Sequence, residues 1–189
     1  MTDGTVTRDE AWTLVKERLT DQALIKHSLA TEAIMRRLAP RFGKDPEVWG
    51  VAGLLHDLDY ATTKDAPERH GLETERILVE KGVSAEIIEA IKSHNAEALG
   101  IARTDTFHFA LTAAENITGL IVATALVQPD KKIAQVKPSS VVKRMKEKGF
   151  ARSVSREGIR LCEQIGIPLE EFVTLSVGAM GSIAGELGL

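Results

Sequence analysis

The chain has 189 residues, of which 43% are hydrophobic and 27% charged, the proportions of an ordinary soluble globular protein. This length suits one domain with a sizeable core and is short for two. Aromatic residues make up only 4%, so the core must consist mainly of Leu, Ile, Val and Ala, a composition that favours packed helices over strands. The single cysteine, Cys162, excludes an intrachain disulfide and a thiolate-rich metal site.

Charge is distributed unevenly along the chain. The formal net charge is −3, but the segment from Lys131 to Arg156 holds nine basic residues and one acidic residue, Glu147. Two interpretations stay open: solvated helix faces, or a rim that attracts phosphate-bearing ligands. Phe150 is the only aromatic residue in the segment, so it offers no stacking platform for bases, and nucleic acid is not an expected partner.

The first residues lack the basic segment and apolar stretch of a secretory signal. The longest uncharged runs are 116–129 and 172–185, both shorter than the roughly 20 residues that span a bilayer. We therefore expect a cytoplasmic protein without membrane contact.

Helix signals recur along the chain, and alternating strand patterns are nearly absent. A residue suited to N-capping precedes each of five predicted helices in the first two thirds of the chain. These residues are Thr7, Asp21, Asp45, Ser84 and Asp105. The helix after Asp105 is expected to reach Pro129 and is apolar nearly all round beyond Asn116, as in a central buried helix.

The segment 60–66 is polar and predicts a loop, and Pro67 predicts the start of a helix that carries His70 and stops at Gly82. Three further helices are expected beyond Pro129, over 138–149, 155–166 and 168–185. We predict an all-α fold in a single domain, 1–189, with a core over about 20–130 and a basic C-terminal helical extension over about 131–189.

Imidazole and carboxylate side chains gather at predicted helix ends and on apolar faces, most clearly in the pair His56-Asp57. A lone histidine of this kind is usually a core or surface residue, so a metal site can be predicted only from these histidines and carboxylates taken together. Nitrogen and oxygen donors together suit Mn, Fe, Ni, Co or Zn, and carboxylate-rich sites also accept Mg. Ligands from separate helices of a bundle can converge on its core. The sequence therefore predicts a site for one or two divalent metal ions.

Four phrases within residues 25–127 resemble the motifs of the HD superfamily of metal-dependent phosphohydrolases. They are Lys26-His27-Ser28, Ala52-Gly53-Leu54-Leu55-His56-Asp57, Ser93-His94-Asn95 and Ala113-Ala114-Glu115-Asn116. The continuation to Leu58-Asp59-Tyr60, the phrase from Thr118 to Ile121 and the basic C-terminal segment are similar to small HDIG-type predicted hydrolases.

This resemblance implies a helical bundle of the HD type with a defined ligand set. The first metal would be held by His27, His56, Asp57 and Glu115. His70 and His94 match the ligands of a second metal in dinuclear members, with Asp57 bridging the two. For His70, a solvated histidine is the alternative.

One position departs from the family, which has aspartate where Glu115 stands. The additional methylene moves the carboxylate by more than about 1 Å, whereas metal–oxygen distances hold within about 0.2 Å. Three outcomes would accommodate the longer side chain: the helix shifts, the glutamate binds bidentately, or metal affinity is reduced. Alternatively, Glu115 is not a ligand and is a hydrogen-bonded partner of His27 or His108. His108 matches no family ligand and either orients Glu115 or is an ordinary helix-face residue.

The resemblance further implies hydrolysis of a phosphoester or phosphoanhydride through a metal-bound hydroxide, with Asp57 as the catalytic residue that accepts the proton of the water. The expected substrate is a small phosphorylated, nucleotide-like molecule. Lys64 is the first candidate for binding its phosphate. Lys131, Lys132 and Lys137 are second candidates, and surface lysines are the alternative for all four.

Two other functions stay open. The same ligand set holds two irons in HD-fold oxygenases that resemble myo-inositol oxygenase. A degenerate HD domain that binds a ligand without catalysis is the other alternative, which Glu115 suggests.

The glycine-spaced last helix, with Gly178, Gly181 and Gly185, is expected to pack closely against a neighbour in the same chain or in another, so a homo-oligomer is a further open alternative.

Overall fold

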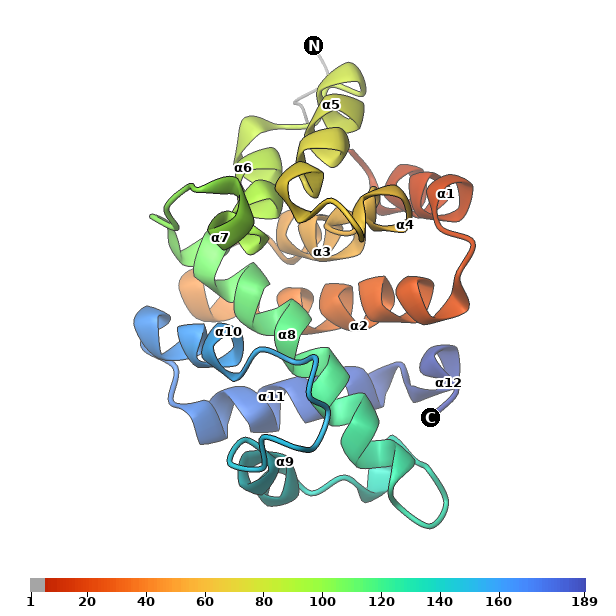
Figure 1. Cartoon of the computed structure of the whole chain (residues 1–189), viewed down its shortest axis with the longest axis vertical. Helices are drawn as coiled ribbons and strands as arrows, with labels where there is room; N and C mark the ends of the chain where they lie inside the picture. Colours follow the sequence, from red (N-terminus) through yellow and green to blue (C-terminus); the bar gives the residue numbers. More distant parts are fainter. Residues whose placement is uncertain (1–5) are drawn as a thin grey trace.

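The computed structural model describes residues 6–189, and all regular secondary structure in this range is helical (Figure 1). The α-helices are α1 (Arg8–Arg18), α2 (Gln22–Leu38), α3 (Pro46–Leu55), α4 (Tyr60–Thr63), α5 (Leu72–Glu80), α6 (Ala85–His94), α7 (Ala96–Leu99), α8 (Thr106–Leu126), α9 (Pro138–Arg144), α10 (Arg156–Arg160), α11 (Leu169–Ser182) and α12 (Ala184–Leu187). Four 3-10 segments connect them: η1 (Ala39–Phe42), η2 (Pro67–Arg69), η3 (Ile133–Gln135) and η4 (Leu161–Ile165). The predicted all-α class is confirmed.

The predicted N-caps explain where α1, α2, α3 and α8 begin. Thr7 forms a capping box at the start of α1. Asp21, Asp45 and Asp105 each accept a hydrogen bond from the backbone N–H two residues further on, at the starts of α2, α3 and α8. Ser84 stands at the N-cap position of α6, but its side chain makes no capping bond.

The chain between α3 and α5 differs from the prediction. Residues 60–66, predicted to be a loop, begin with the short helix α4. The single helix predicted from Pro67 is broken, because His70 is extended and Gly71 has a positive φ of 93°. The backbone N–H of Gly71 donates to the carboxylate of Asp59, so a contact with an earlier part of the chain determines where α5 begins.

The C-terminal helices are shorter than predicted. Helix α9 ends at Arg144, and the helix predicted over 155–166 passes from α10 into η4. The last helix breaks at Ile183, between α11 and α12, where glycines weaken the helix. A Cβ added at Gly178, Gly181 or Gly185 would meet no described atom within 4 Å, so this helix packs within the chain through other side chains, such as Phe172 and Met180, and not through its glycines.

Helix α8 is the centre of the bundle. It packs against α2, α3 and α6 on one side and against α9, α10 and α11 on the other, and Figure 1 shows it crossing the molecule between these groups. It is long and apolar enough to cross a membrane, but 61% of its apolar window is buried inside the bundle, in agreement with the predicted central helix. The C-terminal helices thus share this core helix with the rest of the chain.

Two glycines let α3 lie close to α2. A Cβ added at Gly53 would lie 2.9 Å from the backbone nitrogen of Glu32, and one added at Gly50 would lie 2.6 Å from Cγ of Arg36. Because glycine has no Cβ, the two backbones approach more closely than other residues would permit. The C-terminal end of α3, with His56, is thereby held near His27 on α2.

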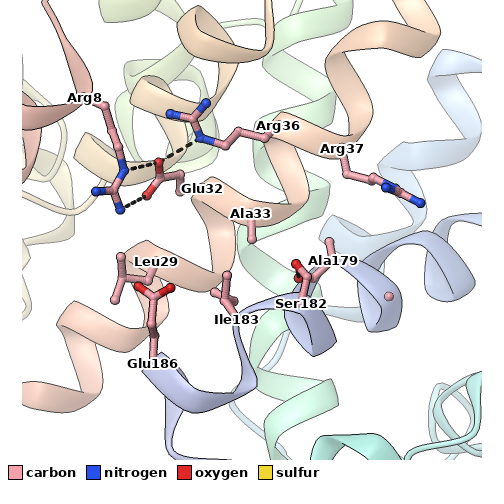
Figure 2. Close-up of a pocket in the computed structure, with 11 residues that line it drawn as sticks. Arg8, Leu29, Glu32, Ala33, Arg36, Arg37, Ala179, Ser182, Ile183 and Glu186 are labelled. Carbon is pink, nitrogen blue, oxygen red and sulfur yellow. Dashed lines mark hydrogen bonds and ion pairs between the residues drawn. The ribbon is translucent and has the colours of Figure 1, made fainter.

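A charged network ties α1 and α3 to the outer face of α2 (Figure 2). Glu32 is only 4% exposed and accepts hydrogen bonds from Arg8 and Arg36, and Arg36 also pairs with Glu47 on α3. A buried carboxylate is costly unless it is paired, so these contacts satisfy a charge that the fold has buried. The network borders a pocket of about 480 Å³ between α2 and α11.

Candidate metal centre

Four histidines and one aspartate converge where α2, α3, α6 and the start of α5 meet. His27 lies on α2, His56 is the C-cap of α3, His70 lies between η2 and α5, and His94 ends α6. Asp57, His56, His70 and His94 are buried, and His27 is half-buried. These are five of the six ligands predicted from the sequence, and the structure brings these five together, whereas the sixth, Glu115, joins neither donor group.

The histidines form two pairs, one at each oxygen of the Asp57 carboxylate. Nε2 of His27 lies 3.1 Å from Nε2 of His56, and these two atoms lie 3.5 and 3.4 Å from Oδ2 of Asp57. Nε2 of His70 lies 2.8 Å from Nε2 of His94, and these two lie 3.3 and 3.7 Å from Oδ1. Asp57 thus belongs to two groups of three donors, each group within 4.8 Å.

These separations fit metal ligands. Two donors that are each about 2.1 Å from one metal ion, at an angle of roughly 90–110°, lie about 3.0–3.4 Å apart. The donor separations in the two groups, 2.8–3.7 Å, bracket that range. Because Asp57 turns one oxygen to each histidine pair, the donor set suits two cations that share one carboxylate.

Hydrogen bonds fix the tautomers of the first histidine pair. Nδ1 of His56 lies 2.8 Å from the carbonyl oxygen of Gly53, which can only accept, so this nitrogen carries the proton. Nδ1 of His27 lies 2.8 Å from Oγ1 of Thr118, whose own proton goes to the carbonyl of Glu115. His27 therefore donates from Nδ1 as well, and in the neutral rings both Nε2 atoms present lone pairs to each other.

The second pair is held in the same way. Nδ1 of His70 donates to Oδ1 of Asp59 at 2.7 Å, and Nδ1 of His94 donates to the carbonyl oxygen of Ile91. Two lone pairs that face each other at about 3 Å repel unless a cation or a proton lies between them. The first pair is the stronger structural argument for a metal ion, because in the metal-free second pair the proton of His70 lies between the two rings at neutral pH.

Electrostatics distinguish His70 from the other histidines. Burial lowers the pKa of His27 to about 4 and, with the neighbouring histidines, that of His94 to about 3. For His70, burial also lowers the pKa, but hydrogen bonds to Asp57 and Asp59 outweigh it and raise the pKa to about 9. Burial would raise the pKa of Asp57, yet the surrounding histidines hold it well below its ordinary value.

This difference predicts a pH dependence. In metal-free protein, His70 is expected to titrate near pH 9, so it must lose a proton before it binds a metal, and affinity at its half of the site should fall about tenfold per pH unit below 9. His27, with a pKa of about 4, is already neutral at pH 7. NMR titration of the imidazole Cε1–H signals, assigned with a His70→Asn variant, measures this; a His70 signal that titrates near pH 6.5 would contradict it.

The same shift predicts how the metal-free protein responds to pH. The pKa of His70 is higher in the folded state than the ordinary value of 6.5, so folding is favoured by its protonation. Its contribution to the free energy of unfolding is fully present below pH 6.5 and is lost as the pH rises through 9.

The sequence did not single out Asp59. Its buried carboxylate accepts hydrogen bonds from His70 and from the backbone N–H groups of Gly71 and Thr74, at 2.7, 2.8 and 3.0 Å. It therefore fixes both the ring of His70 and the start of α5. The sequence indicated no role for this residue. It appeared only as the second aspartate of the phrase 56–60, which is part of the family resemblance.

Asp59→Asn is expected to weaken metal binding at the His70–His94 half of the site by about 10–100-fold and to leave the His27–His56 half unchanged. The amide keeps the shape of the side chain but removes the charge that orients His70. Isothermal titration with Mn²⁺ should show two binding steps in the parent and one tight step in the variant. Asp65→Asn, an exposed position on the same loop, is the matched control; equal weakening of both steps in Asp59→Asn would refute separate halves.

Glu115 lines the same cleft without joining either donor group. The cleft holds about 340 Å³ and is lined by Leu24, His27, Asp57, Tyr60, His70, His94, Asn95 and Glu115. The Glu115 carboxylate accepts a hydrogen bond from the side-chain amide of Asn116. Burial and the nearby Asp57 raise its pKa well above the ordinary value.

The other roles considered for Glu115 and His108 are not observed. Among the described residues, neither His27 nor His108 forms a hydrogen bond with the Glu115 side chain. Nδ1 of His27 pairs with Thr118. Nδ1 of His108 accepts a hydrogen bond from the backbone N–H of Thr104, so His108 does not orient Glu115.

The four lysines proposed to bind phosphate lie outside the cleft. Lys64, Lys131, Lys132 and Lys137 are exposed, and none is among its lining residues. Lys131, Lys132 and Lys137 follow the end of α8, and Leu126 is already about 16 Å along the helix axis from Glu115. Within the described part of the chain, no lysine or arginine lines the cleft.

The fold and the site define an all-helical protein with a cluster of histidines and one aspartate that could hold a divalent metal ion. The chain belongs to the HD domain family, because the family model matches residues 24–126, more than half of the chain and the span from His27 to Glu115. Membership places it, in broad terms, among metal-dependent hydrolases. Comparison with curated proteins and with solved structures gives no match.

Proposed function

We propose that this protein is a metal-dependent phosphohydrolase that cleaves a phosphoester or phosphoanhydride bond in a small phosphorylated molecule. One observation carries the proposal: two histidine pairs face the two oxygens of a single buried carboxylate, Asp57. When bound, two divalent cations supply the charge that attracts phosphate and lower the pKa of a water to near neutrality.

The lining of the cleft supports a phosphate substrate and water as the nucleophile. Its described lining includes no serine, threonine or cysteine, so no aliphatic hydroxyl or thiol lines the cleft as a nucleophile, and the one hydroxyl there is the phenol of Tyr60. It also includes no lysine or arginine. The Asp57 carboxylate alone would not neutralise two bound divalent cations, so a phosphate dianion would meet net positive charge in the cleft.

The two carboxylates suit different tasks. The surrounding histidines keep the pKa of Asp57 low, so it is a poor proton acceptor and a good anionic ligand. Burial and Asp57 raise the pKa of Glu115, which makes its carboxylate the stronger base. We therefore assign acceptance of the proton from the attacking water to Glu115, in place of Asp57, for which the family resemblance implied this role.

The mouth of the cleft would contact the organic part of the substrate. Leu24 and Tyr60 form its apolar wall, and the ring of Tyr60, 38% exposed, stands edge-on to His70 with centroids 5.3 Å apart. Asn95 is held in place by donating to the carbonyl groups of Pro67 and His70. These side chains would orient the leaving group while the buried side of the site excludes water.

The test is phosphate release from a panel of phosphomonoesters, phosphodiesters and nucleotides, by protein stripped of metal and reloaded with Mn, Fe, Co, Ni, Zn or Mg. Activity is expected only after reloading. It should be lost in His56→Ala and retained in His108→Ala, a histidine outside the donor groups. A fully loaded protein that releases no phosphate would refute the proposal; oxygen uptake by the iron form would then favour the oxygenase, and inertness the non-catalytic domain.

A further inference from the structure

The C-terminal half of the chain presents cations that the fold does not use. Seven side chains in the segment 131–156 are exposed and form no ion pair with any described residue. They are Lys131, Lys132, Lys137, Lys143, Lys146, Lys148 and Arg152. The one acidic residue of the segment, Glu147, is already paired with Arg144.

The remaining two cations of the segment have structural roles. The guanidinium of Arg144 lies over the ring of Phe150, 3.8 Å from its centroid. Arg156 donates to backbone carbonyl groups, including those of Ala151 and Val154, at 2.6 and 2.9 Å. The fold of the segment therefore depends on these two arginines, and the seven exposed cations are available to an external partner.

Two exposed aliphatic side chains lie beside this charge. Leu126 and Val127, at the end of α8, are 49% and 54% exposed, and the turn that follows them leads directly to Lys131 and Lys132. Figure 1 shows this turn and α9 at the end of the molecule opposite α5. Exposed apolar side chains bordered by cations are typical of surfaces that contact other molecules.

We propose that the end of the molecule formed by the turn after α8 and the start of α9, with Leu126, Val127, Lys131, Lys132 and Lys137, docks on an anionic lipid bilayer. Lysines lying over anionic headgroups each contribute to such binding, and aliphatic side chains enter the boundary between headgroups and acyl chains. The sequence analysis predicted no membrane contact, and this proposal replaces that expectation with contact at the membrane surface. It does not depend on the catalytic activity.

The details favour lipid over nucleic acid. Six of the seven cations are lysines, point charges that suit a diffuse anionic surface, whereas arginine forks suit bidentate phosphate contacts. The only aromatic ring of the segment, Phe150, is covered by Arg144 and is not free to stack on bases. Leu126 and Val127 would gain nothing from a phosphate backbone but would gain from burial at a bilayer surface.

The test is co-sedimentation of the full chain with vesicles of phosphatidylcholine, alone or with about 30% phosphatidylserine. Binding is expected only to the anionic vesicles and should fall at least about tenfold when salt rises from about 50 to about 500 mM. The triple variant Lys131→Gln, Lys132→Gln, Lys137→Gln should weaken binding by at least about tenfold. Leu126→Ser with Val127→Ser should weaken it several-fold without a change in charge.

A triple variant of exposed lysines elsewhere, Lys16→Gln, Lys44→Gln, Lys81→Gln, has the same change in net charge and should bind as the parent does. Circular dichroism checks that every variant is folded. No binding of the parent to anionic vesicles, or equal weakening in the two triple variants, would overturn the proposal. Tighter binding to an oligonucleotide than to the anionic vesicles would replace lipid with nucleic acid as the partner.

Discussion

Asp57→Ala is expected to reduce the bound metal from two equivalents to none. Among residues 6–189, its carboxylate is the one group in both sets of donors, at 3.4–3.5 Å from one histidine pair and 3.3–3.7 Å from the other, so its removal takes a ligand from both halves at once. Without this anion, two cations would also repel each other across a buried space. Metal content measured by plasma mass spectrometry after reloading provides the answer.

The controls for this prediction separate the bridging role from a general loss of charge. Asp65→Ala removes an exposed carboxylate nearby and should leave two equivalents bound. His94→Ala should keep about one equivalent, because the His27–His56 pair remains intact. If Asp57→Ala still held one or more equivalents, the carboxylate would not bridge the two halves.

Gly53→Ala is the second change with a large expected effect. The added Cβ would lie 2.9–3.0 Å from backbone atoms of Thr31 and Glu32, and backbone cannot move aside as a flexible side chain can. Overpacking of this kind costs about 1–3 kcal/mol in the free energy of unfolding. Because α3 must shift away from α2, His56 should also leave its position 3.1 Å from His27, and metal affinity should fall.

Gly178→Ala is the matched control, because its added Cβ would meet no described atom within 4 Å and Gly178 lies within α11. It should increase stability by about 0.5–1 kcal/mol. Urea unfolding monitored by circular dichroism measures both variants, and Mn²⁺ titration measures the site. A Gly53→Ala protein as stable as the parent would show that close contact of α2 and α3 is not required.

Local signals made most of the fold predictable. Each of Asp21, Asp45 and Asp105 caps the helix that its position predicted, since capping involves only neighbouring residues. The break at His70 and Gly71 could not be predicted in this way. It depends on hydrogen bonds to Asp59, eleven and twelve residues earlier in the chain, which no local pattern specifies.

The candidate site was predictable in composition but not in detail. The phrase ending in His56-Asp57 marked the family, and the helical bundle brought His27, His70 and His94 to it. The tautomers of the histidines could not be predicted from the sequence. They depend on backbone acceptors such as the carbonyl of Gly53, and no sequence motif identifies these acceptors.

One expectation about charge differs from the structure. Lysines were proposed for the phosphate because they stand near the motif or in a basic segment, but exposed side chains such as Lys64 lie outside the cleft. Position in sequence does not specify direction in space. The roles of Asp57 and Glu115 likewise depend on which charges surround each carboxylate, and this follows only from the assembled bundle.

The most direct measurement is an anomalous difference map from crystals of the protein grown with Mn²⁺. The proposed centre predicts two peaks, one beside each oxygen of Asp57, about 3.5–4 Å apart. One peak would be contacted by His27 and His56 and the other by His70 and His94. A map without a peak at Asp57, from crystals that bind Mn²⁺ only at surface carboxylates, would contradict the metal centre on which the proposed hydrolysis depends.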